Sequence, residues 1–296
     1  ELRALVFLTI SLTVALAGLT AGPIGKLLGV RLRRRDTVAI LGAQTLGLAL
    51  GEELRRGRVP VVFVDSNPGG IRRAEEAGFP TVYGNALQES VMERARIGFV
   101  KTVVALTPNT TLNGVFAARA RERFGVPTGL VATSETGGLV SEQVGRGETE
   151  IVFEGAHDVD RWDVRGRRED VEVEHFVYEP PDSKDTSEEK NKNKNKDKAK
   201  KSSVPASIGL NEDSVILAVE RDGTTTPMSL SWRFKPGDRI AVAIHVPERE
   251  DALRALAAKG WRVDRGTGAS ETGEGAGSVE APAGVGGDAS GALQHG

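Results

Sequence analysis

The hydrophobic pattern of the chain begins with one long apolar stretch and then changes to short runs. Residues 4–25 are 22 consecutive residues without a charged side chain, and a helix that crosses the hydrocarbon of a bilayer needs about 20. Five basic residues follow the stretch: Lys26, Arg31, Arg33, Arg34 and Arg35. By the positive-inside rule they lie in the cytoplasm. We therefore predict a membrane-spanning helix over residues 1–30, with the rest of the chain on the cytoplasmic side.

A secretory signal is the alternative interpretation of this stretch, because Ala15, Leu16 and Ala17 imitate a cleavage site. The basic cluster, however, lies on the C-terminal side, whereas a signal carries its charges before the apolar run. Several small and hydroxyl-bearing residues within the stretch suit packing against other membrane helices. Since a single span has little to pack against, we expect the last transmembrane helix of a longer, multi-pass protein.

Between residues 36 and 155, short β-branched runs alternate with helical stretches. The predicted strands are 37–41, 61–64, 81–82, 102–106, 129–132 and 150–153, and the predicted helices are 45–56, 69–77, 87–95, 111–124 and, more weakly, 139–144. Continuous apolar strands that alternate with helices indicate a parallel sheet covered on both faces. The order predicts an α/β, doubly wound (Rossmann-like) nucleotide-binding domain.

A smaller α+β subdomain is predicted over residues 168–262. Its strands are expected at 170–178, 214–219, 230–232 and 239–246, and its helix at 248–259. Residues 182–204 are rich in Lys and Asn, and residues 265–296 are rich in Gly. Neither segment can bury enough apolar surface to order itself. We expect a disordered insertion and a disordered tail.

The clearest chemical motif lies where the first strand of the α/β domain enters its first helix, at the sequence VAILGAQTLG of residues 38–47. Gly42 suits the tight turn, and the N–H groups at the start of the helix form a phosphate site. Asp65 ends the second strand, where a carboxylate accepts hydrogen bonds from ribose hydroxyls. Gln44 replaces a glycine of the dinucleotide fingerprint. Nucleotide binding and a relic domain that keeps Gly42 and Gly47 for packing both remain open.

These segments resemble the RCK domain (also called KTN, of the TrkA-N type) of prokaryotic potassium channels and cation–proton antiporters. The matching pieces are VAILGAQTLG, VVFVD at 61–65, TVYGNA at 81–86 and TVVALTPNTTLN at 102–113. FKPGDRIAVAI at 234–244 is similar to the end of the family's C-terminal subdomain. The first 30 residues look like the last transmembrane helix of a bacterial sodium/proton-type antiporter. The family usually has Asp in place of Asn85.

The resemblance implies a regulatory nucleotide site in the α/β domain. Its expected residues are Gly42, Ala43, Gln44, Thr45, Leu46, Gly47, Asp65, Ser66, Asn67, Gly84, Asn85, Ala86 and Thr107. The expected ligand is NAD(H) or an adenine mononucleotide (AMP, ADP or ATP). The resemblance also implies membrane-embedded transporter helices as partners, and a homodimer. The expected function is the cytoplasmic regulatory region of a cation–proton antiporter of the cell membrane, which gates exchange of Na⁺ or K⁺ against H⁺.

Composition and the remaining motifs exclude several other classes. The 39 Lys and Arg against 41 Asp and Glu give no basic excess for nucleic acid. The absence of Cys excludes disulfide scaffolds, thiol catalysis and cysteine zinc sites. No nucleophile elbow or dehydrogenase Tyr–Lys pair occurs, and we interpret His157 and Asp158 as a surface pair. We expect no enzyme; the alternative is a membrane-anchored NAD-dependent oxidoreductase, because hydride transfer uses the same glycine turn.

Overall fold

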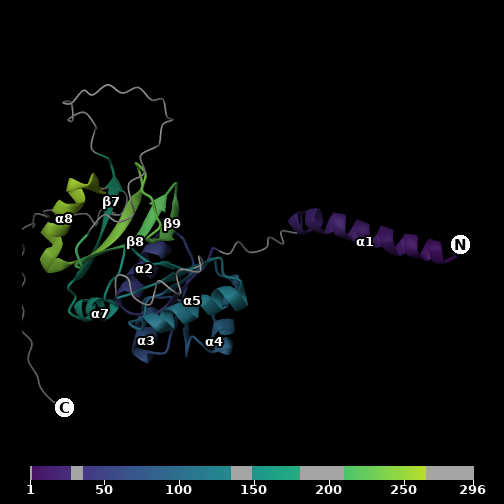
Figure 1. The fold of residues 1–296 in the computed structure, drawn as a ribbon, viewed down its shortest axis with the longest axis horizontal. Helices are drawn as coiled ribbons and strands as arrows, with labels where there is room; N and C mark the ends of the chain where they lie inside the picture. The colour runs from purple at the N-terminus through teal and green to yellow at the C-terminus, as the bar shows by residue number, and fades with distance from the viewer. Residues whose placement is uncertain (1, 28–35, 135–148, 181–209, 265–296) are drawn as a thin grey trace, which may run out of the picture. The chain divides into compact units, whose positions relative to one another are not determined.

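The computed structural model describes residues 2–27, 36–134, 149–180 and 210–264 of the chain (Figure 1). The expectations for the basic residues 31–35, the weak helix at 139–144, the insertion at 182–204 and the tail at 265–296 lie outside these residues.

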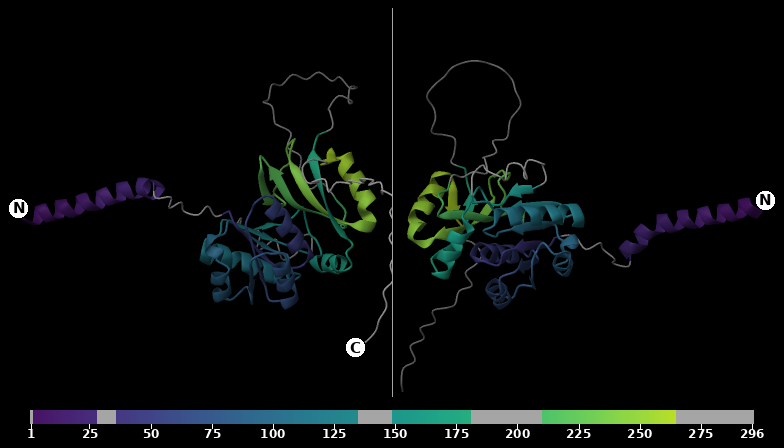
Figure 2. Two further views of the ribbon diagram at one scale, coloured as in Figure 1. Left: turned by 180° about the vertical axis from the view of Figure 1, so that it is seen from behind. Right: turned by 60° about the horizontal axis from the view of Figure 1, so that its bottom comes forward.

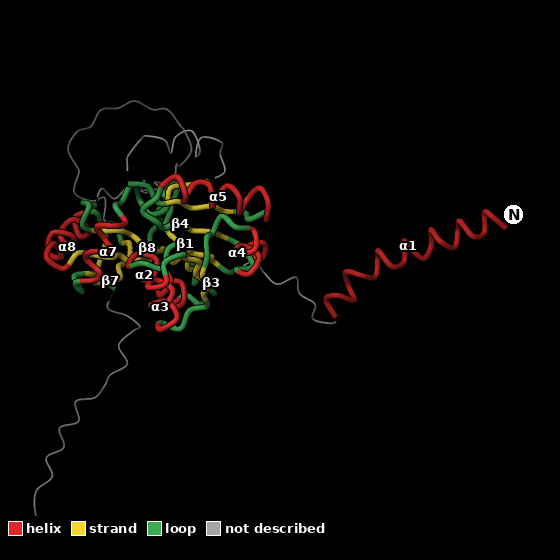
Figure 3. Tube along the Cα trace, turned by 90° about the horizontal axis from the view of Figure 1, so that it is seen from below, coloured by secondary structure: helices red, strands yellow, loops and turns green. Residues whose placement is uncertain are grey.

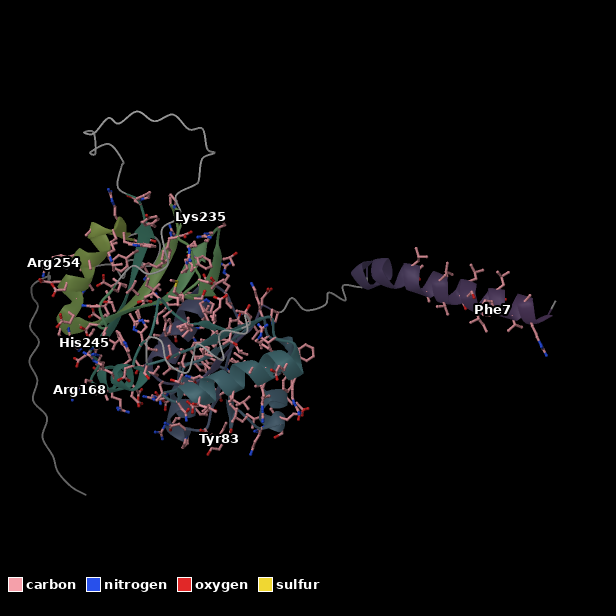
Figure 4. The ribbon with its side chains drawn as sticks, viewed as in Figure 1. Phe7, Tyr83, Arg168, Lys235, His245 and Arg254 are labelled. Carbon is pink, nitrogen blue, oxygen red and sulfur yellow. The ribbon has the colours of Figure 1, made fainter. Side chains whose placement is uncertain are left out.

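The N-terminal helix α1 spans Leu2–Leu27 and coincides with the apolar stretch. Its large apolar side chains between Val6 and Leu19 are exposed; Phe7, which points away from the helix in Figure 4, is 74% exposed. Within the described part of the chain, no helix combines the length and the apolarity that crossing a membrane requires. The spanning helix over residues 1–30 therefore stays a prediction.

Six parallel strands form the first sheet. They are β1 (Val38–Leu41), β2 (Val61–Asp65), β3 (Thr81–Tyr83), β4 (Thr102–Ala105), β5 (Thr128–Val131) and β6 (Thr149–Ile151). Their order is β3-β2-β1-β4-β5-β6, and Leu41 pairs with Val64 on one side and with Ala105 on the other. The carboxyl ends of the central strands thus share one edge. The doubly wound order predicted from the sequence is confirmed.

Helices cover both faces of this sheet (Figure 3). One face carries α2 (Thr45–Arg56) and α3 (Pro68–Glu76); the other carries α4 (Glu89–Arg94), the 3-10 turn η1 (Ile97–Phe99) and α5 (Thr110–Phe124). Along β1, Ile40 belongs to the same buried cluster as Leu50 of α2, whereas its neighbour Leu41 belongs to the cluster that contains Phe116 of α5. Burial on both faces explains why these strands read as continuous apolar runs.

Five antiparallel strands form the second sheet, in the order β11-β7-β10-β8-β9. They are β7 (Val171–Tyr178), β8 (Ser214–Arg221), β9 (Thr224–Pro227), β10 (Arg239–His245) and β11 (Trp261–Val263). The 3-10 turn η2 (Val246–Glu248) leads into α8 (Arg249–Ala258), which covers the outer face of the sheet (Figure 2).

The strand predicted at residues 230–232 is wrong. The chain turns there, with the Trp232 N–H donating to the Ser229 carbonyl at 3.0 Å. The strand that pairs with β8 is β9, and a two-residue turn joins the two through Asp222 (φ 52°) and Gly223 (φ 72°). That geometry suits a hairpin. The polar sequence of β9 hid it from a search for apolar runs.

Helix α2 lies between the two sheets, and α7 (Val159–Arg167) packs beside it (Figure 1). One buried cluster joins Leu50 of α2, Trp162 of α7 and Leu217 of β8. Glu53 of α2, which is buried, also pairs with His175 of β7 at 2.7 Å. The helix that begins at the glycine turn is therefore packed against both sheets.

Candidate functional site

The glycine turn connects β1 to α2 at the carboxyl edge of the parallel sheet. Gly42 has φ +105°, and a Cβ built on it would lie 2.6 Å from the Leu106 carbonyl oxygen. A Cβ built on Gly47 would lie 2.1 Å from the carbonyl oxygen of Gly42. Both positions therefore require glycine, one for its backbone conformation and both for the close approach of main chain.

Side chains of the turn contribute unequally to its surface. Ala43 and Leu46 are buried in the core, so only their main chain can reach a ligand. Gln44 is the N-terminal cap residue of α2, but its side chain makes no capping hydrogen bond. Its buried Oε1 atom has no hydrogen-bond partner within the described residues.

Asp65, at the end of β2, holds the turn together. Its carboxylate is 7% exposed; Oδ2 accepts from the Ala43 N–H at 2.7 Å and Oδ1 from the Asn67 N–H at 2.8 Å. Ser66 and Asn67 are exposed, and the Asn67 side chain caps α3 by accepting from the Gly69 N–H at 2.9 Å. The acidic residue expected to face a ribose therefore also organises the phosphate-type turn.

The loop after β3 reaches the same edge. Gly84 has φ +148°, and its N–H donates to the Asp65 carbonyl at 2.9 Å. Asn85 is exposed, and its Oδ1 atom accepts from the Leu87 N–H at 2.9 Å. Ala86 is buried. Asn85 thus shapes its own turn, as the short side chains of Asn and Asp commonly do.

Thr107 follows β4 and is fixed by Asn113, a residue for which the sequence analysis proposed no role. The Thr107 hydroxyl donates to Asn113 Oδ1 at 2.6 Å, while Asn113 Nδ2 donates to the Thr107 and Ala132 carbonyls at 2.8 and 3.1 Å. Asn113 is fully buried. Its hydrogen-bonding groups are satisfied, so it supports the loops after β4 and β5 rather than facing a ligand.

A cavity of about 240 Å³ opens beside Thr107, at the ends of β4 and β5. Its lining residues are Thr107, Pro108, Thr110, Ala132, Thr133, Ser134, His157, Asp158, Val159 and Asp160. Thr107 is the one predicted site residue among them. The cavity therefore extends the candidate site from the turn toward β5. In the described residues, no group of three or more His, Asp or Glu side chains is arranged to hold a metal ion.

The interpretation of His157 and Asp158 as a surface pair is wrong. His157 is 9% exposed, because it packs edge-on to Phe153 and its Nε2 atom lies 3.4 Å from Glu154 Oε1. Asp158 is exposed and caps α7 by accepting from the Arg161 N–H at 3.1 Å. His157 is therefore packed in the interior beside Phe153, whereas Asp158 is an exposed cap of α7.

Helix α7 covers the start of α2, and the sequence analysis predicted no element there. The Thr45 hydroxyl donates to Asp163 Oδ1 at 3.2 Å, and Asp163 is 5% exposed. A Cβ built on Gly166 would lie 2.1 Å from Thr45 Oγ1. The contact joins residues 118 positions apart, so no local pattern could reveal it. A cap at Asp158 before Trp162 was the available local signal for the helix itself.

Comparison with known proteins finds one family model that matches most of the parallel-sheet domain. Residues 38–138 match the model of the TrkA-N domain. A curated relative, the putative cation/proton antiporter YbaL of Escherichia coli (strain K12), is 29% identical over 84 residues, which are 28% of this chain and 15% of that protein. The chain therefore spans well under two thirds of that relative.

Solved structures show a partial likeness. The TrkA-N domain of inner membrane protein YbaL from Escherichia coli is 21% identical, covers 47% of this chain and 98% of its own, and has a TM-score of 0.37. The GsuK channel bound to NAD is 15% identical, covers 88% of this chain and 47% of its own, and has a TM-score of 0.36. The residues matched by the family model include the glycine turn, Asp65 and the loops after β3 and β4. Over residues 38–138, therefore, this chain is similar to the TrkA-N domain.

Proposed function

We propose that the TrkA-N domain binds an adenine nucleotide as a regulatory ligand. The observation that carries the proposal is the 2.7 Å hydrogen bond between Ala43 N and Asp65 Oδ2, which joins the glycine turn to the carboxylate at the end of β2. The first N–H groups of a helix have no partner within it and favour an anion. A carboxylate at the end of this strand favours ribose hydroxyls. The two together suit the phosphate and the ribose of one nucleotide.

The Asp65 carboxylate can accept hydrogen bonds from the ribose while it keeps its hydrogen bonds to the glycine turn. An ionised carboxylate offers about four lone-pair sites, and the N–H groups of Ala43 and Asn67 occupy two of them. The remaining sites can accept ribose hydroxyls. Replacing Asp65 therefore removes a ligand contact and a support of the turn at once, and its effect on binding must be compared with its effect on stability.

Because of Gln44, we expect the site to bind an adenine mononucleotide more tightly than NAD(H). Its side chain stands where the dinucleotide fingerprint has glycine so that main chain can approach the pyrophosphate. The single phosphate of AMP can lie further out along the axis of α2 and avoid this crowding. ADP, ATP and NAD(H) belong to the same set of ligands and are compared directly in the experiment.

We further propose that this domain regulates a cation–proton antiporter. Support comes from the similarity to YbaL, a putative cation/proton antiporter, and from the exposed apolar side chains along α1. In this proposal, residues 1–30 are the last transmembrane helix, and residues 36–155 and 168–262 are two cytoplasmic lobes. The partners are the membrane helices of the transporter and a second copy of the chain. Nucleotide binding gates exchange of Na⁺ or K⁺ against H⁺, with no reaction catalysed.

Calorimetric titration of the full chain with AMP, ADP, ATP and NAD⁺ tests the nucleotide site. We expect AMP to bind more tightly than NAD⁺. Gln44→Gly should leave AMP affinity unchanged and strengthen NAD⁺ binding. Asp65→Ala should weaken AMP by about tenfold to a hundredfold, which corresponds to about 1.5–3 kcal/mol for hydrogen bonds to a charged group.

The control is Asp251→Ala, which removes an exposed carboxylate on α8 and should leave every affinity unchanged. Thermal unfolding of Asp65→Ala separates lost binding from lost structure. If no nucleotide binds at millimolar concentration, the glycines serve packing alone and the proposal is wrong. If NAD⁺ binds more tightly than AMP and Gln44→Gly does not strengthen it, the ranking by Gln44 is wrong. Reduction of NAD⁺ to NADH by an oxidisable substrate would instead favour the oxidoreductase.

A further inference from the structure

An internal carboxylate lies at the start of the helix that would receive the phosphate. Asp163 Oδ1 is 3.2 Å from the hydroxyl of Thr45, the first residue of α2. The positive end of a helix dipole favours an anion within its first turn. Asp163 is therefore an anion placed where a bound phosphate would gain the same stabilisation.

Two arginines strengthen the hold on this carboxylate. Arg167, one turn further along α7, donates from Nη1 to Asp163 Oδ2 at 2.7 Å. Arg73 of α3 also pairs with this carboxylate, with its Nη2 atom 3.7 Å from Asp163 Oδ1. Both side chains are partly exposed, whereas the carboxylate is buried. Without Asp163, the two guanidinium groups would keep their positive charge beside the turn.

The rest of α7 is tied to the antiparallel sheet. Arg165, which is 6% exposed, pairs with Asp213 just before β8. Arg161 pairs with Asp213 at 3.2 Å and with Glu212 at 2.9 Å. Helix α7 thus contacts the glycine-turn helix through Asp163 and the second sheet through two arginines. A change at the turn that moves α7 would also act on the start of β8.

We propose that Asp163 is a built-in competitor of the nucleotide phosphate. It holds α7 over the turn when no ligand is bound, and the phosphate binds by displacing the Asp163 carboxylate and pairing with Arg73 and Arg167. The inference rests on the proposed nucleotide site and adds its regulation. Because the competent state must be formed at the expense of the Asp163 contacts, apparent affinity is lower than the intrinsic affinity of the turn.

The test compares AMP with adenosine, which lacks the phosphate, by calorimetry on the full chain. Asp163→Asn keeps the shape of the side chain and an oxygen for the Thr45 hydroxyl but removes the charge. It should strengthen AMP binding by about tenfold, because a like charge close to the phosphate is removed, and leave adenosine binding unchanged. Asp251→Asn, which removes the charge of an exposed carboxylate on α8, is the matched control and should change neither affinity.

The outcomes separate this inference from the proposed function. If the original chain binds AMP and Asp163→Asn does not raise the affinity for AMP, the proposed competition by Asp163 is wrong, but the proposed nucleotide site is not contradicted. If Asp251→Asn strengthens AMP binding equally, or if adenosine gains as much affinity as AMP, the effect is not competition for the phosphate position. If no variant binds either ligand, both proposals are wrong. Asp163→Ser replaces Asp163→Asn if the latter does not unfold cooperatively, with the same expected gain for AMP.

Discussion

At the scale of single residues, the sequence predicts the positions of the turn but not how they are used. Gly42 and Gly47 are recognisable because the strand, the turn and the helix follow one another locally. Asp65 is recognisable by its place at the end of a strand. Its bond to Ala43 N, which spans 22 residues, and the burial of Gln44 Oε1 depend on how the loops meet in space. No spacing rule contains that information.

Gly47→Ala tests the requirement for close main-chain approach. Alanine favours a helix by about 1 kcal/mol over glycine, but here its Cβ would lie 2.1 Å from the Gly42 carbonyl oxygen. We expect a net loss of about 1–3 kcal/mol in the free energy of unfolding, as for an overpacked site. Denaturant unfolding measures it. Gly155→Ala is the control, because no heavy atom lies within 4 Å of its built Cβ. Equal stability of the two variants would show that the turn adapts.

At the scale of elements, the parallel strands are predictable because a strand that is buried on both faces has a continuous run of apolar residues. β9 and α7 were missed for a shared reason. The three threonines of β9 are stabilised by pairing with β8, and α7 is stabilised by α2 and by the loop before β8. Elements that depend on distant partners carry little local signal.

The ion pair between Arg221 and Asp238 fixes the end of β8 to the turn before β10. Asp238 is 2% exposed and accepts from Arg221 Nε at 2.7 Å and from Nη2 at 2.6 Å. Donation of these hydrogen bonds to the Asp238 carboxylate raises the pKa of the Arg221 guanidinium above its ordinary value. Since a raised pKa of a base stabilises the fold at every pH below the unfolded-state pKa, this contribution is constant through neutral pH and is lost only in strong alkali.

Arg221→Ala should therefore lower the free energy of unfolding by about 1.5–3 kcal/mol, the usual value of hydrogen bonds to a charged group. The loss should be equal at mildly acidic and neutral pH in denaturant unfolding. Arg254→Ala removes an exposed pair with Asp251 on α8 and should cost at most about 0.5 kcal/mol. Similar losses for the two variants would contradict the role of the buried carboxylate.

At the scale of the whole molecule, α2 connects the candidate nucleotide turn to both sheets. Its first residue contacts Asp163, its middle packs under β8, and Glu53 pairs with His175 of the second sheet. The sequence predicts two lobes in order along the chain. It does not predict that one helix is packed between their sheets, because that contact joins surfaces far apart in sequence. A ligand at the start of α2 would act on an element that both sheets share.

Hydrogen exchange of the full chain, with and without saturating AMP, tests this account most directly. AMP should slow exchange of the backbone amides at residues 43–47 and at Asn67, because the phosphate and ribose occupy the turn. It should speed exchange across α7, because the phosphate displaces Asp163 from Thr45. Protection confined to residues outside the turn, or unchanged exchange at residues 43–47 under saturation, would contradict a nucleotide site at the glycine turn.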